Sequence, residues 1–358
     1  MKLKKRKNQL RFKKKLVVAI TLIILMMLGI GYSFLSANLN IKGNIFLKSN
    51  RLEKTSMFTS GTIVNNKMKE ITNSEGINHS IKRIIRSESI PDNYKNNNYI
   101  VSDNESKEPI YIWYEDNTIY LYSLAETLFL NEDSSYMFSD LYNLDNIDIE
   151  GLDTSKVINM SYMFNYAGYN NEKIEYNLKE WNTSKVEDMS YMFYNCGRES
   201  NSINLDLSSW DTSSVSNMRS MFEYMGNKAL TYDLNLSNWN LLKVSNMSNM
   251  FYNSGYEAKE LNLNIDNWNT ENVKDISQMF YNFASSIDSF KLDISNWNLK
   301  EIENMTDLFT NTGMNALEWE IIIPKMSNEL ENSISIIYGK DETISYTLEN
   351  KEFTIKDS

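Results

Sequence analysis

The residue types that most often carry chemistry are scarce in this sequence. Cys196 is the only cysteine and His79 the only histidine, which excludes an intramolecular disulfide, a Cys/His zinc site and most histidine-dependent mechanisms together. Cys196 lies within a repeated segment, where we interpret it as a small buried core residue rather than a reactive thiol. The sequence therefore predicts no catalytic residue, no bound metal and no cofactor.

Carboxylates are the one reactive group present in large number. Nine of the 36 basic residues lie in the first 15 positions, which leaves 27 basic against 47 acidic residues and a net charge of −20 for the rest of the chain. A pair of carboxylates is enough for a glycosidase. Acids that recur with a repeat period are more typical of a solvated face, and an acidic body repels phosphate backbones, so we expect no nucleic-acid partner.

The N-terminal sequence predicts a helix that crosses a membrane. Residues 1–15 form a basic segment, and residues 16–35 (LVVAITLIILMMLGIGYSFL) carry no charge over a length that would cross a bilayer as a helix. The positive-inside rule places the basic segment in the cytoplasm and the remainder outside. We therefore predict a bacterial single-pass membrane protein with its repeats outside the cell, the alternative being a cleaved signal peptide and a secreted protein.

Internal repeats organise most of the remaining chain. Tryptophans recur every 29 residues from Trp181 to Trp297, and Leu152 holds the same phase one period earlier. An apolar pair follows each of them, from Met163-Phe164 to Leu308-Phe309. This period predicts an array of like units, each of which needs its neighbours to bury its apolar face.

The pattern within one unit predicts a strand followed by a short helix. Leu205 and Leu207 alternate with polar residues, as in a strand with one buried face. Val215, Met218 and Met221-Phe222 are then spaced like the apolar stripe of a helix. The predicted fold class is an α/β repeat solenoid of the leucine-rich-repeat type, with a parallel sheet built from one short strand and one short helix per repeat, preceded by the transmembrane helix.

Two sets of repeat positions are assigned different roles. The aromatic positions predict a structural core: Trp181, Trp210, Trp239, Trp268, Trp297, Phe164, Phe193, Phe222, Phe251 and Phe280. The polar positions four residues before the tryptophan phase predict a recognition face on the outside of the sheet: Asp148, Asn177, Asp206, Asn235, Asn264 and Asp293. Because stacked strands are separated by about 4.8 Å, acids two strands apart are too far from one another to share a calcium ion.

The segments around the repeats complete the domain plan. Residues 36–107 are polar and predict a membrane-proximal region, and residues 108–123 predict a hairpin that caps the first repeat. The repeat array is expected over residues 124–314. Residues 315–358 are rich in β-forming residues and predict a C-terminal cap.

The repeat unit resembles a known family. The pattern W-[DN]-T-S-x-V-x-x-M-x-x-M-F, best matched by residues 181–193 and 210–222, is similar to that of the BspA-like leucine-rich-repeat surface proteins of bacteria, as are EDSSYMF at 132–138 and WEIIIPK at 319–325. The resemblance covers residues 108–339. It implies a solenoid displayed at the cell surface and often associated with adhesion, and it implies no chemistry.

Three function hypotheses follow from these features. The first is a non-enzymatic surface protein for binding or adhesion, whose partner is an extracellular protein or glycan. The second is a structural protein of the cell envelope without a soluble ligand. The third is a carboxylate-based surface glycoside hydrolase.

Overall fold

The computed structural model describes residues 54–324 and 352–356. These residues belong to one compact unit, residues 53–358, and the other unit, residues 1–52, lies outside the described part. The described elements in chain order are β1 (Thr55–Met57), α2 (Gly61–Ile71), β2 (Arg83–Arg86), η1 (Asp92–Tyr94), η2 (Asn97–Tyr99), β3 (Tyr111–Glu115), β4 (Thr118–Tyr122), β5 (Thr127–Phe129), β6 (Asn146–Asp148), β7 (Leu152–Asp153), β8 (Lys173–Ile174), β9 (Ser202–Asp206), β10 (Thr231–Asn235), β11 (Glu260–Leu263), β12 (Ser289–Asp293), β13 (Glu318–Pro324) and β14 (Glu352–Lys356).

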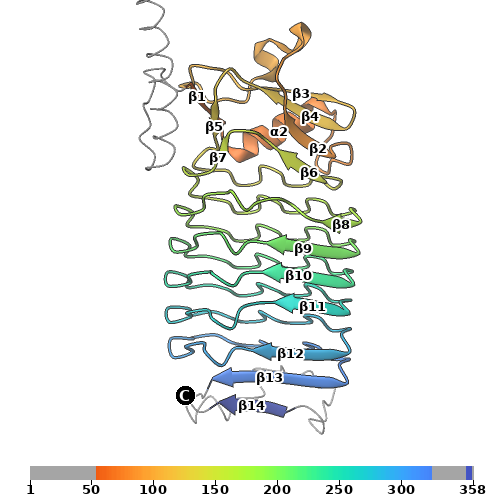
Figure 1. The fold of residues 1–358 in the computed structure, drawn as a ribbon, viewed down its shortest axis with the longest axis vertical. Coiled ribbons are helices and arrows are strands. Elements are labelled where there is room, and N and C mark those ends of the chain that lie inside the picture. Colours follow the sequence, from red (N-terminus) through yellow and green to blue (C-terminus); the bar gives the residue numbers. More distant parts are fainter. Residues whose placement is uncertain (1–53, 325–351, 357–358) are drawn as a thin grey trace, which may run out of the picture. The chain divides into compact units, whose positions relative to one another are not determined.

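The repeats form a stack of coils, each one 29-residue unit that we name by its tryptophan. Strands β8 to β11 form one parallel sheet, in which β9 pairs with β10 in a register that joins Asp206 to Asn235. Strand β13 pairs with β12 in the same register, since Phe290 lies opposite Trp319. Figure 1 shows these strands one above another along the stack. The 29-residue period of the sequence is therefore the spacing of neighbouring coils, and it extends into β13.

The predicted α/β repeat solenoid is wrong, because no repeat contains a helix. In the described residues α2 is the one α-helix, and it precedes the repeats. The segment predicted to be helical in the Trp210 coil holds two left-handed residues, Ser220 at φ 55° and Tyr224 at φ 58°. An α-helix needs φ near −63° at every residue. The repeats consist of short strands in small sheets joined by tight turns.

Hydrogen bonds between coils explain why these turns replace a helix. The backbone N–H groups of Ser220, Phe222 and Tyr224 donate to carbonyls of the next coil at 2.8–2.9 Å. Alternate residues are thus satisfied by a neighbouring coil rather than by their own turn. Val215, Met218, Met221 and Phe222 are fully buried all the same. The spacing of the apolar residues correctly predicted which side chains face inward. The same spacing can occur in turns and in helices, so it did not predict the backbone conformation.

Side chains add further links between coils. The indole Nε1 of Trp210 donates to the Leu178 carbonyl of the preceding coil at 3.0 Å, and Trp239, Trp268 and Trp297 make the equivalent bond. The Thr212 hydroxyl donates to the Asn240 carbonyl of the following coil at 2.9 Å. The Trp and Thr of the repeat motif therefore hold neighbouring coils together.

A cap of mixed structure precedes the stack. Strands β3 and β4 form an antiparallel hairpin whose turn residues, Asp116 and Asn117, have positive φ. Strand β2 lies between β4 and β6, and Val64 and Met68 of α2 are buried in the same core. Residues 54–107, expected to be a polar membrane-proximal region, are thus folded into this cap.

The predicted membrane localisation finds no support in the structure. Within residues 54–324 and 352–356 there is no helix long and apolar enough to cross a bilayer. The predicted anchor, residues 16–35, lies outside the described residues. The expected single-pass topology is not retained, and the secreted alternative is compatible with this finding.

Candidate functional site

A short ladder of tyrosines lies on the outer side of the first coils. Tyr136, Tyr162 and Tyr191 occupy equivalent turn positions, each at a φ of 57° to 60°. Their rings stack with centroids 4.7 Å and 4.6 Å apart and planes within 5° of parallel. Tyr136 is 40% exposed, and the other two are half-buried. We call these three residues the outer ladder.

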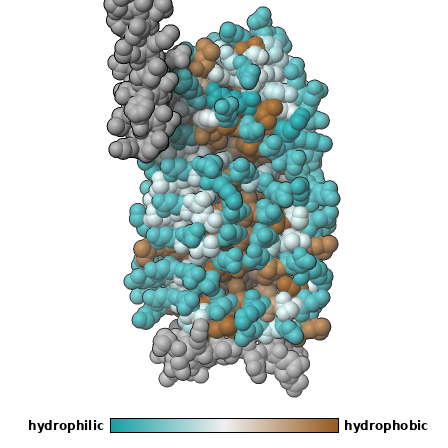
Figure 2. Space-filling model, in the orientation of Figure 1, coloured by the Kyte–Doolittle hydropathy of each residue, from teal (hydrophilic) through white to brown (hydrophobic). Residues whose placement is uncertain are grey.

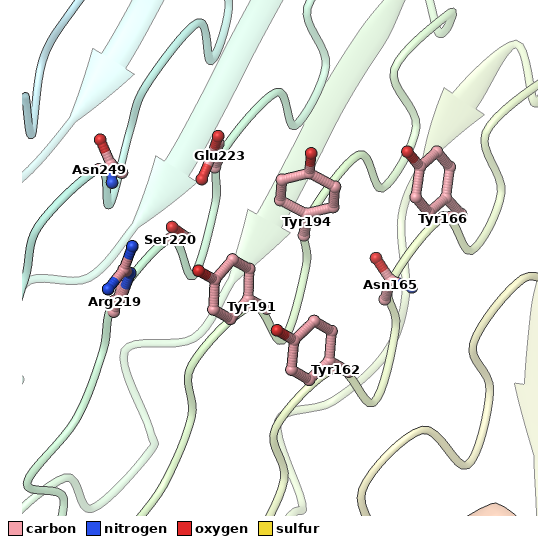
Figure 3. A pocket seen from close by; sticks show the side chains of 9 residues that line it. All are labelled: Tyr162, Asn165, Tyr166, Tyr191, Tyr194, Arg219, Ser220, Glu223 and Asn249. Atoms are coloured by element: carbon pink, nitrogen blue, oxygen red, sulfur yellow. The ribbon is translucent and has the colours of Figure 1, made fainter.

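An open pocket of about 480 Å³ begins where the outer ladder stops. Figure 3 shows Tyr162 and Tyr191 near its centre, with Tyr194, Tyr166 and Asn165 on one side and Arg219, Ser220 and Asn249 on the other. The residues that line it are Tyr162, Asn165, Tyr166, Tyr191, Tyr194, Arg219, Ser220, Glu223 and Asn249. The pocket thus draws on side chains from four consecutive coils.

The pocket arises because side-chain size changes from coil to coil. At the outer-ladder position, tyrosine gives way to Ser220 and then to Asn249. At the position thirteen residues after the tryptophan phase, Asn165 is followed by Tyr194 and Glu223. A uniform repeat would fill both columns evenly, so the hollow exists only where the repeats differ from one another.

Burial dominates the electrostatics of the pocket. It raises the pKa of Glu223 above its usual range, although the nearby Ser220 hydroxyl and Arg219 guanidinium oppose the shift. Burial, followed by the charge of Glu223, raises the pKa of Tyr194 to about 12. Burial also raises the pKa of Tyr162. Tyr162 and Tyr194 are therefore neutral hydrogen-bonding groups, and Glu223 is a carboxylate held partly away from water.

Ser220 has an unusual position at the base of the pocket. Its side chain is fully buried beside Glu223, and its hydroxyl opposes the effect of burial on the pKa of that carboxyl. A side chain without exposed surface cannot contact a ligand, so Ser220 belongs to the floor beneath the pocket. Arg219, the preceding residue, is exposed at the rim.

The predicted recognition face is only partly assembled. Asp206 and Asn235 lie side by side on β9 and β10. Asp148 instead ends β6, where it pairs with Ile85 of β2 in a different sheet. Asp148, Asn177 and Asn264 are exposed, whereas Asp206, Asn235 and Asp293 are half-buried.

Three of these polar side chains have structural contacts within their own coils. The Oδ1 atoms of Asp206, Asn235 and Asp293 accept the backbone N–H two residues ahead at 2.9–3.3 Å, which is the geometry of an Asx turn. An ion pair with Lys179 at 2.7 Å, together with Ser208, lowers the pKa of Asp206 to about 2. These contacts account for Asp or Asn at the position without a ligand, and recognition through this face stays a prediction.

The aromatic core positions lie inside the stack. Phe164, Phe193, Phe222, Phe251 and Phe280 are fully buried, and their rings stack from coil to coil at 5.2–5.6 Å. Trp210, Trp239, Trp268 and Trp297 are at most 4% exposed, and Trp181 is half-buried. Cys196 is buried beside them, and burial raises the pKa of its thiol well above the ordinary value. It is placed for packing rather than for reaction.

No metal centre is found in the described part of the chain, where no three His, Cys, Asp or Glu side chains are grouped to hold an ion. The pocket offers hydrogen-bonding groups and ring faces, which suit reversible binding. Sequence reasoning missed it because it scored the constant positions of the repeat. The signal was present in the column that runs from Tyr162 and Tyr191 to Ser220, where a large residue is replaced by a small one.

These features define a class of repeat protein, in which parallel coils of short strands and turns stack in register and carry an open, tyrosine-lined pocket. Two overlapping matches to a family described as "Mycoplasma protein of unknown function, DUF285" cover residues 132–256 and 224–320. Together they span more than half of the chain, so the chain belongs to this family. No curated protein and no solved structure matches the chain.

Proposed function

We propose that the chain is a non-enzymatic binding protein of the adhesion type, whose repeat stack presents the pocket to an extracellular protein or glycan. The observation that carries the proposal is the aromatic character of an open, water-accessible surface. Tyr162, Tyr166, Tyr191 and Tyr194 gather around one open pocket of the stack. The face of the stack drawn in Figure 2 is largely hydrophilic, with hydrophobic side chains along its middle. Tyrosine is typical of binding surfaces because it joins a large apolar ring to a polar tip.

The repeat motif supports the same proposal. Its pattern of W-[DN]-T-S and M-x-x-M-F resembles that of the BspA-like surface proteins, which are often associated with adhesion. The family that the chain belongs to has no assigned function, so the resemblance adds only this association. It carries no information about the partner.

Catalysis of glycoside hydrolysis is a weaker proposal for this pocket. Glycosidases place two carboxyl groups about 5–9.5 Å apart. Glu223 is the one carboxylate among the nine residues that line the pocket. A single carboxylate can accept hydrogen bonds from a ligand but cannot supply both the acid and the base.

The proposal is tested by binding of the full-length chain to a panel of immobilised extracellular-matrix proteins, glycans and bacterial surfaces. We expect at least one partner that binds the wild type and is lost with Tyr191→Ser, because Ser220 shows that the next coil holds serine at that position. Tyr256→Ser is the matched control. It also introduces the residue that the following coil carries, Ser285, but lies outside the pocket.

A second variant separates the pocket from the predicted recognition face. Replacement of Asn177, Asn235 and Asn264 with Lys alters that face and leaves the pocket intact. Binding lost in this variant but kept in Tyr191→Ser would transfer the site to the strands. The absence of any partner for the wild type across the panel would contradict the proposal and favour a structural role in the envelope.

A further inference from the structure

The outer ladder leaves one ring face without a stacked neighbour. One face of Tyr191 is covered by Tyr162 at 4.6 Å. The opposite face points along the stack towards the next coil, where Ser220 occupies the equivalent position. A serine side chain is too short to lie over the outer part of a phenol ring, and no described aromatic ring stacks there. A flat ligand ring in the next place along the ladder would continue the existing spacing.

The polar groups around that place are mixed in type. Arg219 and Asn249 offer N–H donors, and Glu223 offers a carboxylate acceptor. These groups surround the free face of Tyr191 on the side where the ladder ends (Figure 3). A ligand that fits must therefore have an apolar face and a rim of groups that both donate and accept hydrogen bonds.

The charges of the pocket favour a neutral ligand. Arg219 and Glu223 are its two charged side chains, and they are close enough that Arg219 acts on the pKa of Glu223. Their charges cancel, so neither a free cation nor a free anion gains net attraction. The remaining seven residues are tyrosines, asparagines and a serine.

We propose that the pocket binds a neutral hexopyranose unit of a glycan, stacked on the free face of Tyr191, with its hydroxyls hydrogen bonded to Glu223 and Arg219. A pyranose ring has C–H groups on its faces and hydroxyls around its edge, which matches a single aromatic face bordered by donors and acceptors. The side chain of an aromatic residue from a protein partner would stack equally well but would leave Glu223 and Arg219 without hydrogen bonds to the ligand. The inference rests on the proposed binding function and specifies its ligand class.

The openness of the pocket sets the expected strength of binding. A single small ring that stays partly in water makes few contacts, so a dissociation constant of about 1 mM is expected for a monosaccharide. A chain of like units reaching several copies of the protein would bind more tightly through avidity. This favours repeated glycans as the natural source of the unit.

The test is a ligand-observed NMR titration of the full-length chain with methyl glycosides of neutral hexoses. The comparison ligands are an open-chain alditol, a uronic acid, tetramethylammonium and N-acetyl-tyrosine amide. We expect the neutral glycosides to bind, the alditol to bind at least tenfold more weakly because it has no ring face, and both charged probes to show no binding.

Two variants test the pocket by opposite changes, one that removes an aromatic ring and one that adds a ring. Tyr191→Ser removes the stacking face, and Ser220→Tyr fills the place next to it with a ring of the protein itself. Position 220 has φ 55°, close to the 57° at which Tyr191 already carries a phenol ring, so the second change suits the turn. Each should weaken glycoside binding at least tenfold, whereas Tyr256→Ser should leave it unchanged.

The outcomes separate this inference from the function on which it rests. Glycoside binding that persists in both variants would overturn the pocket as the site. If no neutral glycoside binds but a protein from the wider panel does so in a Tyr191-dependent way, the glycan inference fails and the binding function stands. If neither glycosides nor proteins bind, both fail. Tighter binding of tetramethylammonium than of any glycoside would also overturn the inference.

Discussion

Two aromatic ladders run through the same coils and behave differently. The inner ladder, from Phe138 to Phe309, places a phenylalanine in every coil, with ring centroids 5.2–5.7 Å apart, and all of its rings are buried. The outer ladder stacks as closely but ends after Tyr191, where Ser220 replaces tyrosine. Constant side chains serve the packing that all coils share, whereas a change along a column creates a local surface. The pocket lies where the outer ladder ends.

The largest expected effect concerns the period that both ladders share. Deletion of the whole 29-residue unit 239–267 should leave a shorter, cooperatively folded stack, because the coils on either side can meet in the same register. Deletion of the half unit 239–252 should abolish cooperative unfolding, because the turns and strands of neighbouring coils would no longer coincide. Circular dichroism during urea titration measures both. Equal damage from the two deletions would contradict the stacking of like coils.

Single substitutions should distinguish the ladders by size of effect. Phe222→Ala leaves a cavity in the buried inner ladder and should lower the free energy of unfolding by about 3–5 kcal/mol. Tyr191→Ser loses one partly exposed stacked pair and should lower it by about 0.5–1.5 kcal/mol. Denaturant unfolding of the two variants checks the difference. A larger loss for Tyr191→Ser would mean that the outer ladder is structural.

The turns that carry both ladders can be tested at their glycines. Gly226 has φ 51°, and an added Cβ would lie 2.3 Å from Ile203 Cγ1, so Gly226→Ala should cost at least about 1–2 kcal/mol. The equivalent residue two coils on is Ala284, at φ 46°, so that turn already carries a Cβ. Ala284→Gly should therefore change the thermal midpoint only slightly, because relief of the left-handed strain is offset by the greater backbone entropy of glycine. A Gly226→Ala protein as stable as the wild type would show that the turn accommodates a Cβ despite the short distance to Ile203.

The smallest expected effect is a dependence on pH that belongs to the pocket alone. The folded state raises the pKa of Glu223, so it binds more protons than the unfolded state, and stability falls as pH rises from the ordinary carboxyl range of about 4.3 through the raised value. Glu223→Gln removes this titration. The variant should match the wild type near about pH 4 and have the higher thermal midpoint near about pH 7. A lower midpoint at neutral pH would show that the carboxylate stabilises the fold.

The sequence by itself determined the register of the stack. The 29-residue spacing of Trp210, Trp239 and their equivalents is the offset between paired strands, and the alternation of Leu205 and Leu207 marked a strand and its buried face. These features follow from periodicity, because like positions in stacked coils must meet like environments. The same information identified the inner aromatic residues.

Only the tertiary structure determined the backbone conformation between the strands and the location of the pocket. Met218, Met221 and Phe222 are spaced as in a helix, yet the N–H groups of Met218 and Phe222 donate to carbonyls of the next coil, which a local pattern cannot reveal. Residues 54–107 look polar along the chain, but β2 and α2 bury their few apolar side chains against the hairpin. Tyr191 and Glu223 come together because the stack sets one coil beside the next at a fixed short distance. Contacts of that kind depend on which coils are neighbours and how far each side chain reaches, and the sequence of a single repeat records neither.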